Sequence, residues 1–319
     1  MNRSIRWGVL GYARIASTQV IPAMAEAQNA VPYAIASRSA EKLKEAKEAF
    51  GFEKTYEGYE ALLSDPNVDA VYIPLPNALH KEWTIKAARA GKHVLCEKPL
   101  ALNEKDCREM IAVCEECGVQ LMEAFMYRLS TRTRKLEALL ESGVIGEVRH
   151  IHSSFRFVLN RDSIKMQEGL GGGSLWDVGC YPVNIIGMVM KDMPVACTAQ
   201  KVMNNGVDIS FAATLKYKNG VICTLSSGFN SSSALLTEID GTAGSIVVRD
   251  SFLETDTPIL LVKDGVFTEI EVEPCKRYVL EIEDFSKAVQ TGGRPALSLE
   301  EAARNNGLME MLLKKAEEV

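Results

Sequence analysis

The sequence predicts two domains: an N-terminal α/β domain with a doubly wound parallel sheet, and a C-terminal α+β domain with a large, open, mostly antiparallel sheet. In residues 5–122 short apolar runs alternate with amphipathic helical segments, which is typical of consecutive βαβ units. From residue 146 onward, strand candidates follow one another with few helices between them. The length of 319 residues also fits two domains of roughly 150 residues each. We assign residues 1–122 to the first domain and residues 123–319 to the second.

The first domain is predicted from strands and helices in regular alternation. We expect strands at residues 5–10, 31–37, 70–73, 93–96 and 119–122. We expect helices at residues 40–50, 59–63, 79–90 and 104–117. Because successive strands of such units run parallel, their carboxyl ends meet at one edge of the sheet, where ligands of these folds bind.

The second domain is predicted from strands joined by turns. We expect strands at residues 148–158, 196–203, 207–218, 221–227, 235–240, 244–248, 259–262 and 267–272, and helices at 278–290 and 299–317. Asn204-Asn205-Gly206 and Asn219-Gly220 have the residues of hairpin turns. Helices can cover only one face of so large a sheet. We therefore expect a second copy of the chain on the other face, in a homodimer or a higher homo-oligomer.

Composition excludes several classes of protein. Hydrophobic residues make up 47% and charged residues 24%, as in an ordinary soluble globular protein. The net charge is −6 with scattered positive residues, which argues against nucleic-acid binding. No stretch approaches the roughly 18 apolar residues of a membrane span, and the first apolar run, broken by Arg14, does not have the form of a signal peptide. We expect a cytoplasmic protein that binds neither nucleic acid nor membrane.

Cysteines and histidines give no sign of a metal site. Without an export signal, the eight cysteines are expected as reduced thiols. Cys114 and Cys117 form a C-x-x-C pair, but a zinc site needs a second ligand pair at matching spacing, which the sequence lacks. His150 and His152 alternate on a predicted strand, with no carboxylate or third histidine close in sequence, so we interpret them as sheet surface residues.

A glycine turn follows the first predicted strand. Gly11-Tyr12-Ala13-Arg14-Ile15-Ala16 has the form G-x-A-x-x-A, a relaxed version of the dinucleotide-binding fingerprint. Gly11 allows the tight turn, Ala13 lets the backbone approach a pyrophosphate, and the helix N-terminus offers N–H groups to the phosphates. Alone, this motif could equally be an unrelated strand–helix turn. The alternating context favours a Rossmann domain.

The second strand ends at Ser37-Arg38-Ser39. An NAD-selective site usually has a carboxylate here to bind the ribose 2′-hydroxyl. A hydroxyl and a guanidinium instead suit a 2′-phosphate, because Arg binds phosphate through paired donors. We therefore expect NADP(H) to be favoured over NAD(H). Ser39 could also simply cap the next helix, and both roles can hold together.

Two further strands end in residues suited to the nicotinamide end of a cofactor. One is followed by Pro74-Leu75-Pro76-Asn77 and then by His80; the other ends in Glu97-Lys98-Pro99. A Lys-Pro pair is a fixed, non-helical bend, which would direct Lys98 into the crevice at the strand ends.

The second half contains a candidate catalytic stretch from Gly171 to Tyr181, which begins with three glycines. A triple glycine indicates close approach of the backbone to a ligand or a neighbouring segment. If a helix begins near Asp177, then Asp177 and Tyr181 lie four apart on one face. A carboxylate beside a phenol, with Lys98 opposite, would make Tyr181 a proton-transfer group. The alternatives are a helix cap for Asp177 and a core aromatic for Tyr181.

These motifs, in this order, resemble the oxidoreductase family of glucose–fructose oxidoreductase, inositol dehydrogenase and the rhizopine-catabolism proteins (Gfo/Idh/MocA). The resemblance covers essentially the whole chain. It rests on Gly8 to Ala16, on Glu97-Lys98-Pro99, on Glu123 to Arg128 and on Gly171 to Tyr181. Residues 71–77 look most like the branch of dimeric dihydrodiol dehydrogenase and NADP-dependent xylose dehydrogenase.

The resemblance implies site residues and an activity. Lys98 would be the catalytic lysine, Asp177 would assist, and Tyr181 would be the general acid/base in place of the histidine of the inositol dehydrogenase branch. Asn184 replaces an aspartate of many members, which makes a cyclic polyol less expected. The reaction implied is hydride transfer between NAD(P)(H) and a carbinol or carbonyl carbon of a sugar, polyol or trans-diol. The alternatives are a non-catalytic NADP-binding regulator and a reductase of anhydro-sugars or dicarbonyls.

The cofactor contacts that we expect come from both halves. They are Gly11, Tyr12, Ala13, Arg14, Ile15, Ser37, Arg38, Pro74, Leu75, Asn77, His80, Glu97, Lys98, Arg128 and Trp176. Weaker candidates for the substrate pocket are Arg156, Phe157, Lys165 and Tyr278.

Overall fold

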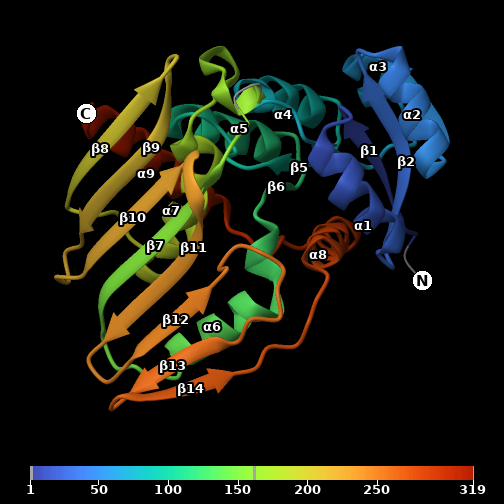
Figure 1. Cartoon of the computed structure of the whole chain (residues 1–319). Helices are drawn as coiled ribbons and strands as arrows, with labels where there is room; N and C mark the ends of the chain where they lie inside the picture. The colour runs from blue at the N-terminus through green and yellow to red at the C-terminus, as the bar shows by residue number, and fades with distance from the viewer. Residues whose placement is uncertain (1–2, 161–162, 319) are drawn as a thin grey trace. The chain divides into compact units, whose positions relative to one another are not determined.

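Six parallel strands form the first sheet of the computed structural model, which describes residues 3–160 and 163–318 (Figure 1). The strands are β1 (Ile5–Leu10), β2 (Ala30–Ser37), β3 (Lys54–Glu57), β4 (Ala70–Ile73), β5 (His93–Glu97) and β6 (Leu121–Ala124). Their order is β3-β2-β1-β4-β5-β6, with parallel pairing throughout. This is the Rossmann order, which reverses between β1 and β4. The predicted doubly wound parallel sheet is confirmed.

Helical segments connect these strands. They are η1 (Ala16–Val20), α1 (Ile21–Glu26), α2 (Ala40–Phe50), α3 (Tyr59–Leu63), η2 (Asn77–Leu79), α4 (His80–Arg89), α5 (Glu104–Glu116) and η3 (Met126–Leu129). The last strand of this sheet, β6, begins two residues later than predicted. The Val119 amide instead donates to the Cys114 carbonyl at 3.0 Å, in the turn that follows α5.

By its internal contacts the chain divides into two compact units. The first unit contains the residues up to Ala101, Lys105–Leu129 and Lys276–Ala302; the second contains Leu102–Glu104, Ser130–Cys275 and the residues from Ala303 on. Helix α8 (Arg277–Thr291) belongs to the first unit because it packs on α1, η1, β1 and η3. Trp7 on β1 also donates through Nε1 to Ser286 Oγ at 3.1 Å. The division into domains at residue 122 stays a prediction.

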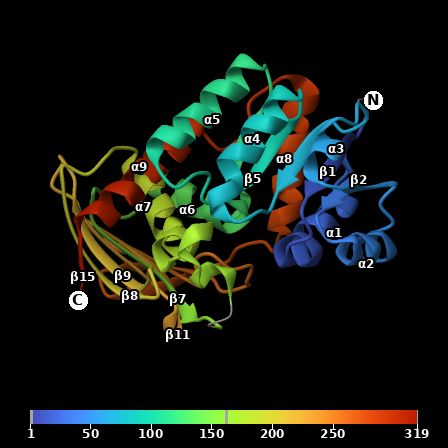
Figure 2. The ribbon, with the colours of Figure 1, turned by 90° about the horizontal axis from the view of Figure 1, so that it is seen from above.

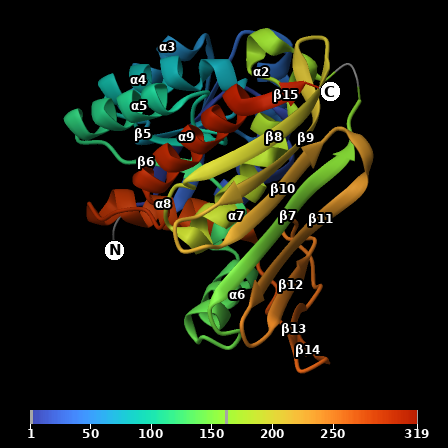
Figure 3. The same ribbon diagram turned by 90° about the vertical axis from the view of Figure 1, so that its left-hand side faces the viewer.

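Nine strands form the sheet of the second unit (Figure 3). The strands are β7 (Val148–Val158), β8 (Ala196–Asn204), β9 (Val207–Lys216), β10 (Ile222–Gly228), β11 (Asn230–Gly241), β12 (Ser245–Arg249), β13 (Ile259–Lys263), β14 (Val266–Ile270) and β15 (Ala316–Glu318). Their order is β14-β13-β12-β11-β7-β10-β9-β8-β15. Only the β7–β10 and β8–β15 pairings among these are parallel, so the predicted open, mostly antiparallel sheet is confirmed.

Helices of the second unit lie on one face of this sheet (Figure 2). They are α6 (Thr131–Glu141), η4 (Ile164–Met166), η5 (Glu168–Leu170), η6 (Leu175–Gly179), α7 (Cys180–Met190) and the greater part of α9 (Leu299–Lys315). Helix α7 packs against β7 and β10. On α6, Arg132 donates to the carbonyls of Arg249, the last residue of β12, and of Asp250, which follows it. Of the helices that the structure describes, none is long and apolar enough to span a membrane.

Candidate active site

The glycine turn after β1 can be built only with glycine. Gly11 has a φ of +109°, and a Cβ there would lie 3.1 Å from Leu75 Cδ2. The Gly11 amide donates to the Ala36 carbonyl on β2 at 2.8 Å, which fixes the turn at the carboxyl edge of the sheet. The chain then enters the helical segment η1–α1, whose first residue, Ala16, is fully buried. This is the local geometry that a phosphate-binding strand–helix turn requires.

The end of β2 presents hydroxyls and one cation. Ser37 is 5% exposed, and its Oγ accepts from the Ser39 amide at 3.1 Å. Arg38 is exposed beside it. Ser39 Oγ accepts from the Lys42 amide, so its predicted capping of α2 is confirmed. Sequence reasoning missed Glu57, which the unpredicted strand β3 places opposite Ser37 in the sheet register.

His80 joins the loops that follow β4 and β5. The ring is fully buried, with Nδ1 2.8 Å from the Pro99 carbonyl oxygen and Nε2 2.8 Å from the Leu75 carbonyl oxygen. The loop after β5 begins with Lys98, whose peptide bond to Pro99 is cis. The residues predicted to lie at the ends of these two strands therefore meet at one edge of the first sheet.

Carboxyl groups surround the Lys98 segment within the first unit. Tyr72 donates through its hydroxyl to Glu97 at 2.6 Å, and the Leu100 amide donates to Glu123 at 2.7 Å. Burial raises the pKa of Glu123 to about 8, and it raises the pKa of Glu281 well above the usual range. At a pKa of about 8, Glu123 is expected to carry a proton near neutral pH. A buried acidic network this close to a lysine marks a candidate functional site.

Arg128, expected to contact a cofactor, forms an ion pair with Glu301 inside the first unit. Both side chains are largely buried. Tyr278 also lies in the first unit, on α8 and close to Arg277, whose guanidinium is 5.3 Å from the Tyr278 ring centroid. The ion pair between Arg128 and Glu301 could not be predicted from the sequence, because the two residues are 173 positions apart.

The second unit brings Asp177 and Tyr181 onto consecutive helical segments. Asp177 is on η6, where its carboxylate pairs with the Lys165 ammonium at 2.8 Å. Tyr181 follows on α7, with ring centroids of Phe155 and Phe252 at 5.3 and 5.2 Å. The Lys165 ammonium also lies 5.9 Å from the centroid of the Phe157 ring. An ion pair thus orients the carboxylate, while aromatic packing orients the phenol.

The triple glycine packs against the chain itself. A Cβ on Gly172 would overlap the Lys165 carbonyl oxygen, and one on Gly173 would overlap Asp208 Oδ1. Asp208 is 4% exposed; its other carboxylate oxygen accepts from Ser174 Oγ at 2.6 Å and from the Leu175 amide at 2.9 Å. The glycines thus let a buried carboxylate anchor the start of the segment that carries Trp176 and Asp177.

Arg156 and Phe157 are adjacent on β7 and so point to opposite faces of the sheet. Phe157 faces the side of Lys165 and Phe229. Arg156 donates to Ser210 Oγ at 2.8 Å and to Ser231 Oγ at 3.0 Å across neighbouring strands. Arg156 therefore serves as a link between strands, and of these two substrate-pocket candidates only Phe157 shares a face with Tyr181.

The described residues form two partial sites, one in each unit. Lys98, His80 and the glycine turn lie in the first unit, and Asp177, Tyr181 and Lys165 in the second. Among residues 3–160 and 163–318, no group of three or more His, Cys, Asp or Glu side chains is placed to hold a metal ion. A Rossmann sheet with a glycine turn after β1 and a buried acid–lysine network at its edge defines the class of dinucleotide-dependent oxidoreductases.

Comparison with known proteins identifies the family. Residues 5–125 match the model described as an oxidoreductase family with an NAD-binding Rossmann fold, and residues 133–247 match the GFO/IDH/MocA C-terminal domain. The chain is 34% identical to D-xylose 1-dehydrogenase (NADP(+)) 2 of Haloferax volcanii over 317 residues, covering 98% of this chain and 97% of that protein. It is 32% identical to trans-1,2-dihydrobenzene-1,2-diol dehydrogenase of Xenopus laevis over 270 residues, covering 84% and 81%.

A solved structure agrees with these matches. A 3-ketoreductase from Actinomadura kijaniata, in complex with NADP and TDP-benzene, superposes with a TM-score of 0.94 at 32% identity, covering 99% of each chain. The chain therefore belongs to the Gfo/Idh/MocA family of NAD(P)-dependent oxidoreductases. The predicted family, and its resemblance to the xylose dehydrogenase and dihydrodiol dehydrogenase branch, are confirmed.

Proposed function

We propose that this enzyme transfers a hydride between NADP(H) and a carbinol or carbonyl carbon of a sugar, sugar derivative or trans-diol. The observation that carries the proposal is the Lys165–Asp177 ion pair at 2.8 Å, one helical turn before Tyr181. It provides an oriented carboxylate and a phenol on consecutive helical segments, which is a proton-transfer arrangement. The names of the relatives, a xylose dehydrogenase, a dihydrodiol dehydrogenase and a 3-ketoreductase, support this range of substrates.

Three side chains of this enzyme have separate roles in the proposed reaction. When bound, the nicotinamide accepts or supplies the hydride. Tyr181 takes the hydroxyl proton during oxidation and returns it during reduction. Lys98 holds the reacting oxygen and stabilises negative charge that develops on it. Asp177 keeps the polar surroundings of Tyr181 in a fixed orientation through Lys165.

The residues at the end of β2 fit NADP(H) better than NAD(H). Ser37 and Arg38 could hold a 2′-phosphate through a hydroxyl and a guanidinium, and the strand ends without a carboxylate of its own. The relatives named with NADP support the preference. Glu57, opposite Ser37 in the sheet register, is a carboxylate that could favour a free 2′-hydroxyl, and it is exposed.

We further propose a homo-oligomer formed through the sheet face opposite α7, in a cytoplasmic enzyme. By the strand register, Val202, Ile222 and Phe267 share this face, and they are 39%, 45% and 72% exposed. Exposed apolar side chains on a sheet favour burial against a partner. All eight cysteines are free thiols, which suits a reducing compartment.

The test is substitution of the two proposed catalytic groups. Tyr181→Phe and Lys98→Met are assayed for NADPH formation or consumption with a panel of aldoses, polyols, trans-diols and 3-keto sugars. We expect each variant to lose at least about 100-fold in kcat, as is common when a proton-transfer group is removed. Activity within twofold of the parent in both variants would contradict the assignment. Tight NADP binding without turnover by the parent would instead favour the regulator.

A further inference from the structure

His80 occupies a special position at the carboxyl edge of the first sheet. It is the first residue of α4, and its fully buried ring lies between the loop after β4 and the loop after β5. The two ring nitrogens are each 2.8 Å from a backbone carbonyl oxygen, that of Leu75 in one loop and that of Pro99 in the other. Both nitrogens face carbonyl oxygens of the chain itself, so neither is directed at a cofactor.

The chemistry of these contacts shows what the ring does. Carbonyl oxygens only accept, so each contact is a hydrogen bond only if the ring nitrogen carries a proton. A neutral imidazole donates to one loop, and an imidazolium donates to both. Burial lowers the pKa of His80, the Pro99 and Leu75 carbonyls raise it, and the Lys98 charge lowers it. The lowered pKa favours the neutral ring, which donates to one of the two carbonyls and packs against the other, so the ring still fills the space between the two loops.

Pro99 directly follows Lys98, so a contact with the Pro99 carbonyl holds the residue next to the lysine. The amide of that same peptide unit, that of Leu100, is held by Glu123 at 2.7 Å. The preceding carboxylate, Glu97, is held by the Tyr72 hydroxyl at 2.6 Å. Of these three attachments, only that of His80 fixes the Lys98 segment to the loop after β4, which carries the other residues expected at the nicotinamide.

We propose that His80 is a positioning residue: it sets the location of Lys98 for hydride transfer by tying the loop after β5 to the loop after β4. This inference rests on the reaction proposed above. It replaces the expectation that His80 contacts the cofactor directly, because both ring nitrogens face backbone carbonyl oxygens.

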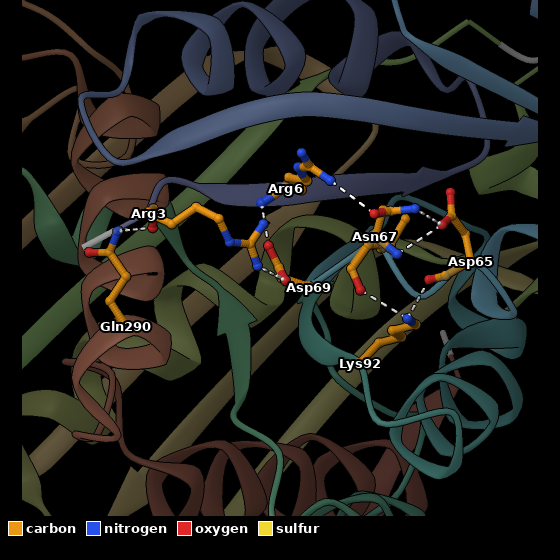
Figure 4. A network of polar contacts seen from close by, with 8 residues as sticks. Arg3, Arg6, Asp65, Asn67, Asp69, Lys92 and Gln290 are labelled. Atoms are coloured by element: carbon orange, nitrogen blue, oxygen red, sulfur yellow. Dashed lines mark hydrogen bonds and ion pairs between the residues drawn. The ribbon is translucent and has the colours of Figure 1, made fainter. Parts of the chain in front are cut away.

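A matched control lies at the opposite edge of the same sheet (Figure 4). Lys92 is 6% exposed, and its ammonium donates to the carbonyls of Asp65 at 2.6 Å and Val68 at 2.9 Å. Like His80, it is a buried side chain that joins a segment next to β4 to a segment next to β5. Unlike His80, it acts where the strands begin, away from Lys98. The surrounding contacts, including those of Asp69 with Arg3 and with the Arg6 amide, are likewise at this amino-terminal edge.

The experiment compares His80→Ala, His80→Gln and Lys92→Met in the full chain. The first readout is hydrogen exchange of the amides in residues 97–101, measured by mass spectrometry without cofactor or substrate. The second is steady-state kinetics with NADP(H), together with the Kd for NADP and the thermal midpoint. Gln retains N–H donors but lacks the ring that spans the two loops, so it tests whether hydrogen bonding alone gives partial recovery.

We expect His80→Ala to speed exchange in residues 97–101 by at least about tenfold. We also expect it to lower kcat by at least about tenfold, because small misplacement of a catalytic group is costly. The Kd for NADP should change by less than about threefold, and His80→Gln should fall in between. Lys92→Met should lower the thermal midpoint while leaving both the exchange of residues 97–101 and kcat within about twofold of the parent.

Two results would overturn the inference. Unchanged exchange in residues 97–101 of His80→Ala and His80→Gln would show that the ring does not hold the loop. Faster exchange with unchanged kcat would show that the loop is held but that Lys98 does not depend on it. A parent that turns over no substrate would refute the proposed function instead, and the exchange measurement would then still decide whether His80 fixes the segment of Lys98.

Discussion

Replacing Gly173 by Ala tests the account of the triple glycine. Gly173 has a φ of +116°, which a non-glycine residue adopts at a cost of about 1–3 kcal/mol. The new Cβ would also overlap Asp208 Oδ1. Asp208 cannot swing away freely, because its other oxygen accepts from Ser174 Oγ and from the Leu175 amide. Losing one such bond to a charged group costs roughly 1.5–3 kcal/mol.

Together these costs predict a loss of about 3–5 kcal/mol in the free energy of unfolding of the second unit. For a domain of this size, that corresponds to a fall of roughly 6–20 °C in the thermal midpoint. Differential scanning calorimetry on the full chain measures it. The control is Gly169→Ala in the same stretch, where a Cβ would have nothing within 4 Å. We expect the control to lie within about 2 °C of the parent.

The steric explanation for Gly173 is refuted if Gly173→Ala unfolds within about 2 °C of Gly169→Ala. That result would mean that Asp208 gives way without loss, and that the glycine is not required by this contact. A large loss in both variants would equally contradict the explanation, because Gly169 has open space around it.

Three further predictions concern binding, catalysis and pH. Arg38→Ala should weaken NADP binding by about tenfold with little effect on NAD binding, measured by fluorescence titration. An unchanged ratio of NADP affinity to NAD affinity would exclude a contact between Arg38 and the 2′-phosphate. The control is Glu57→Gln, which is expected to leave NADP binding intact. Lys165→Met should lower kcat by about tenfold and Lys165→Arg much less, since only the arginine keeps a cation beside Asp177. Equal kcat values in the two variants would argue against a role of the Lys165 charge in orienting Asp177. Because burial raises the pKa of Glu123 to about 8, the folded state binds a proton that the unfolded state releases above its own pKa near 4.5. The free energy of unfolding should therefore fall as pH rises from about 5 to 8, by an amount on the order of 4 kcal/mol at most. Urea titrations at the two pH values should show that Glu123→Gln removes this part of the pH dependence. The same pH dependence in parent and variant would refute the prediction.

Much of the fold could be predicted because strand patterns are local. Strand β7 runs over residues 148–158 as predicted, since its apolar and polar residues alternate along the strand. Strand β3 was missed because Lys54–Glu57 is a short edge strand with no buried residue to give a pattern. Helix α6, which buries Arg132 and Thr133 beside Leu136, also lacked a clear apolar stripe. The place of α8 in the first unit depends on contacts with β1 and α1, which sequence order does not reveal.

The candidate site was predictable where chemistry depends on neighbours in sequence. The turn at Gly11 and the spacing of Asp177 and Tyr181 are such cases. Side-chain partners on other strands were not predictable, because they are fixed by sheet register. His150, for example, has no carboxylate close in sequence, and the sheet register brings its Nδ1 to 3.2 Å from Asp240 on β11. The ion pair between Asp177 and Lys165 joins residues on either side of a loop, and it likewise could not be predicted from the sequence.

The helical turn Leu175–Gly179 is π-helical, with one residue more than an α-helical turn would use. A one-residue deletion in this turn could therefore be absorbed by reverting it to α-helix, without breaking α7 or the strands beneath it. Each residue in an α-helix advances the side-chain direction by about 100°. A shortened variant would keep its fold but turn residue 177 away from Lys165. The extra residue in this turn thus sets the direction in which the side chain of residue 177 points. The length of the turn is a trait by which relatives with reoriented acid–base groups could be recognised from sequence alone.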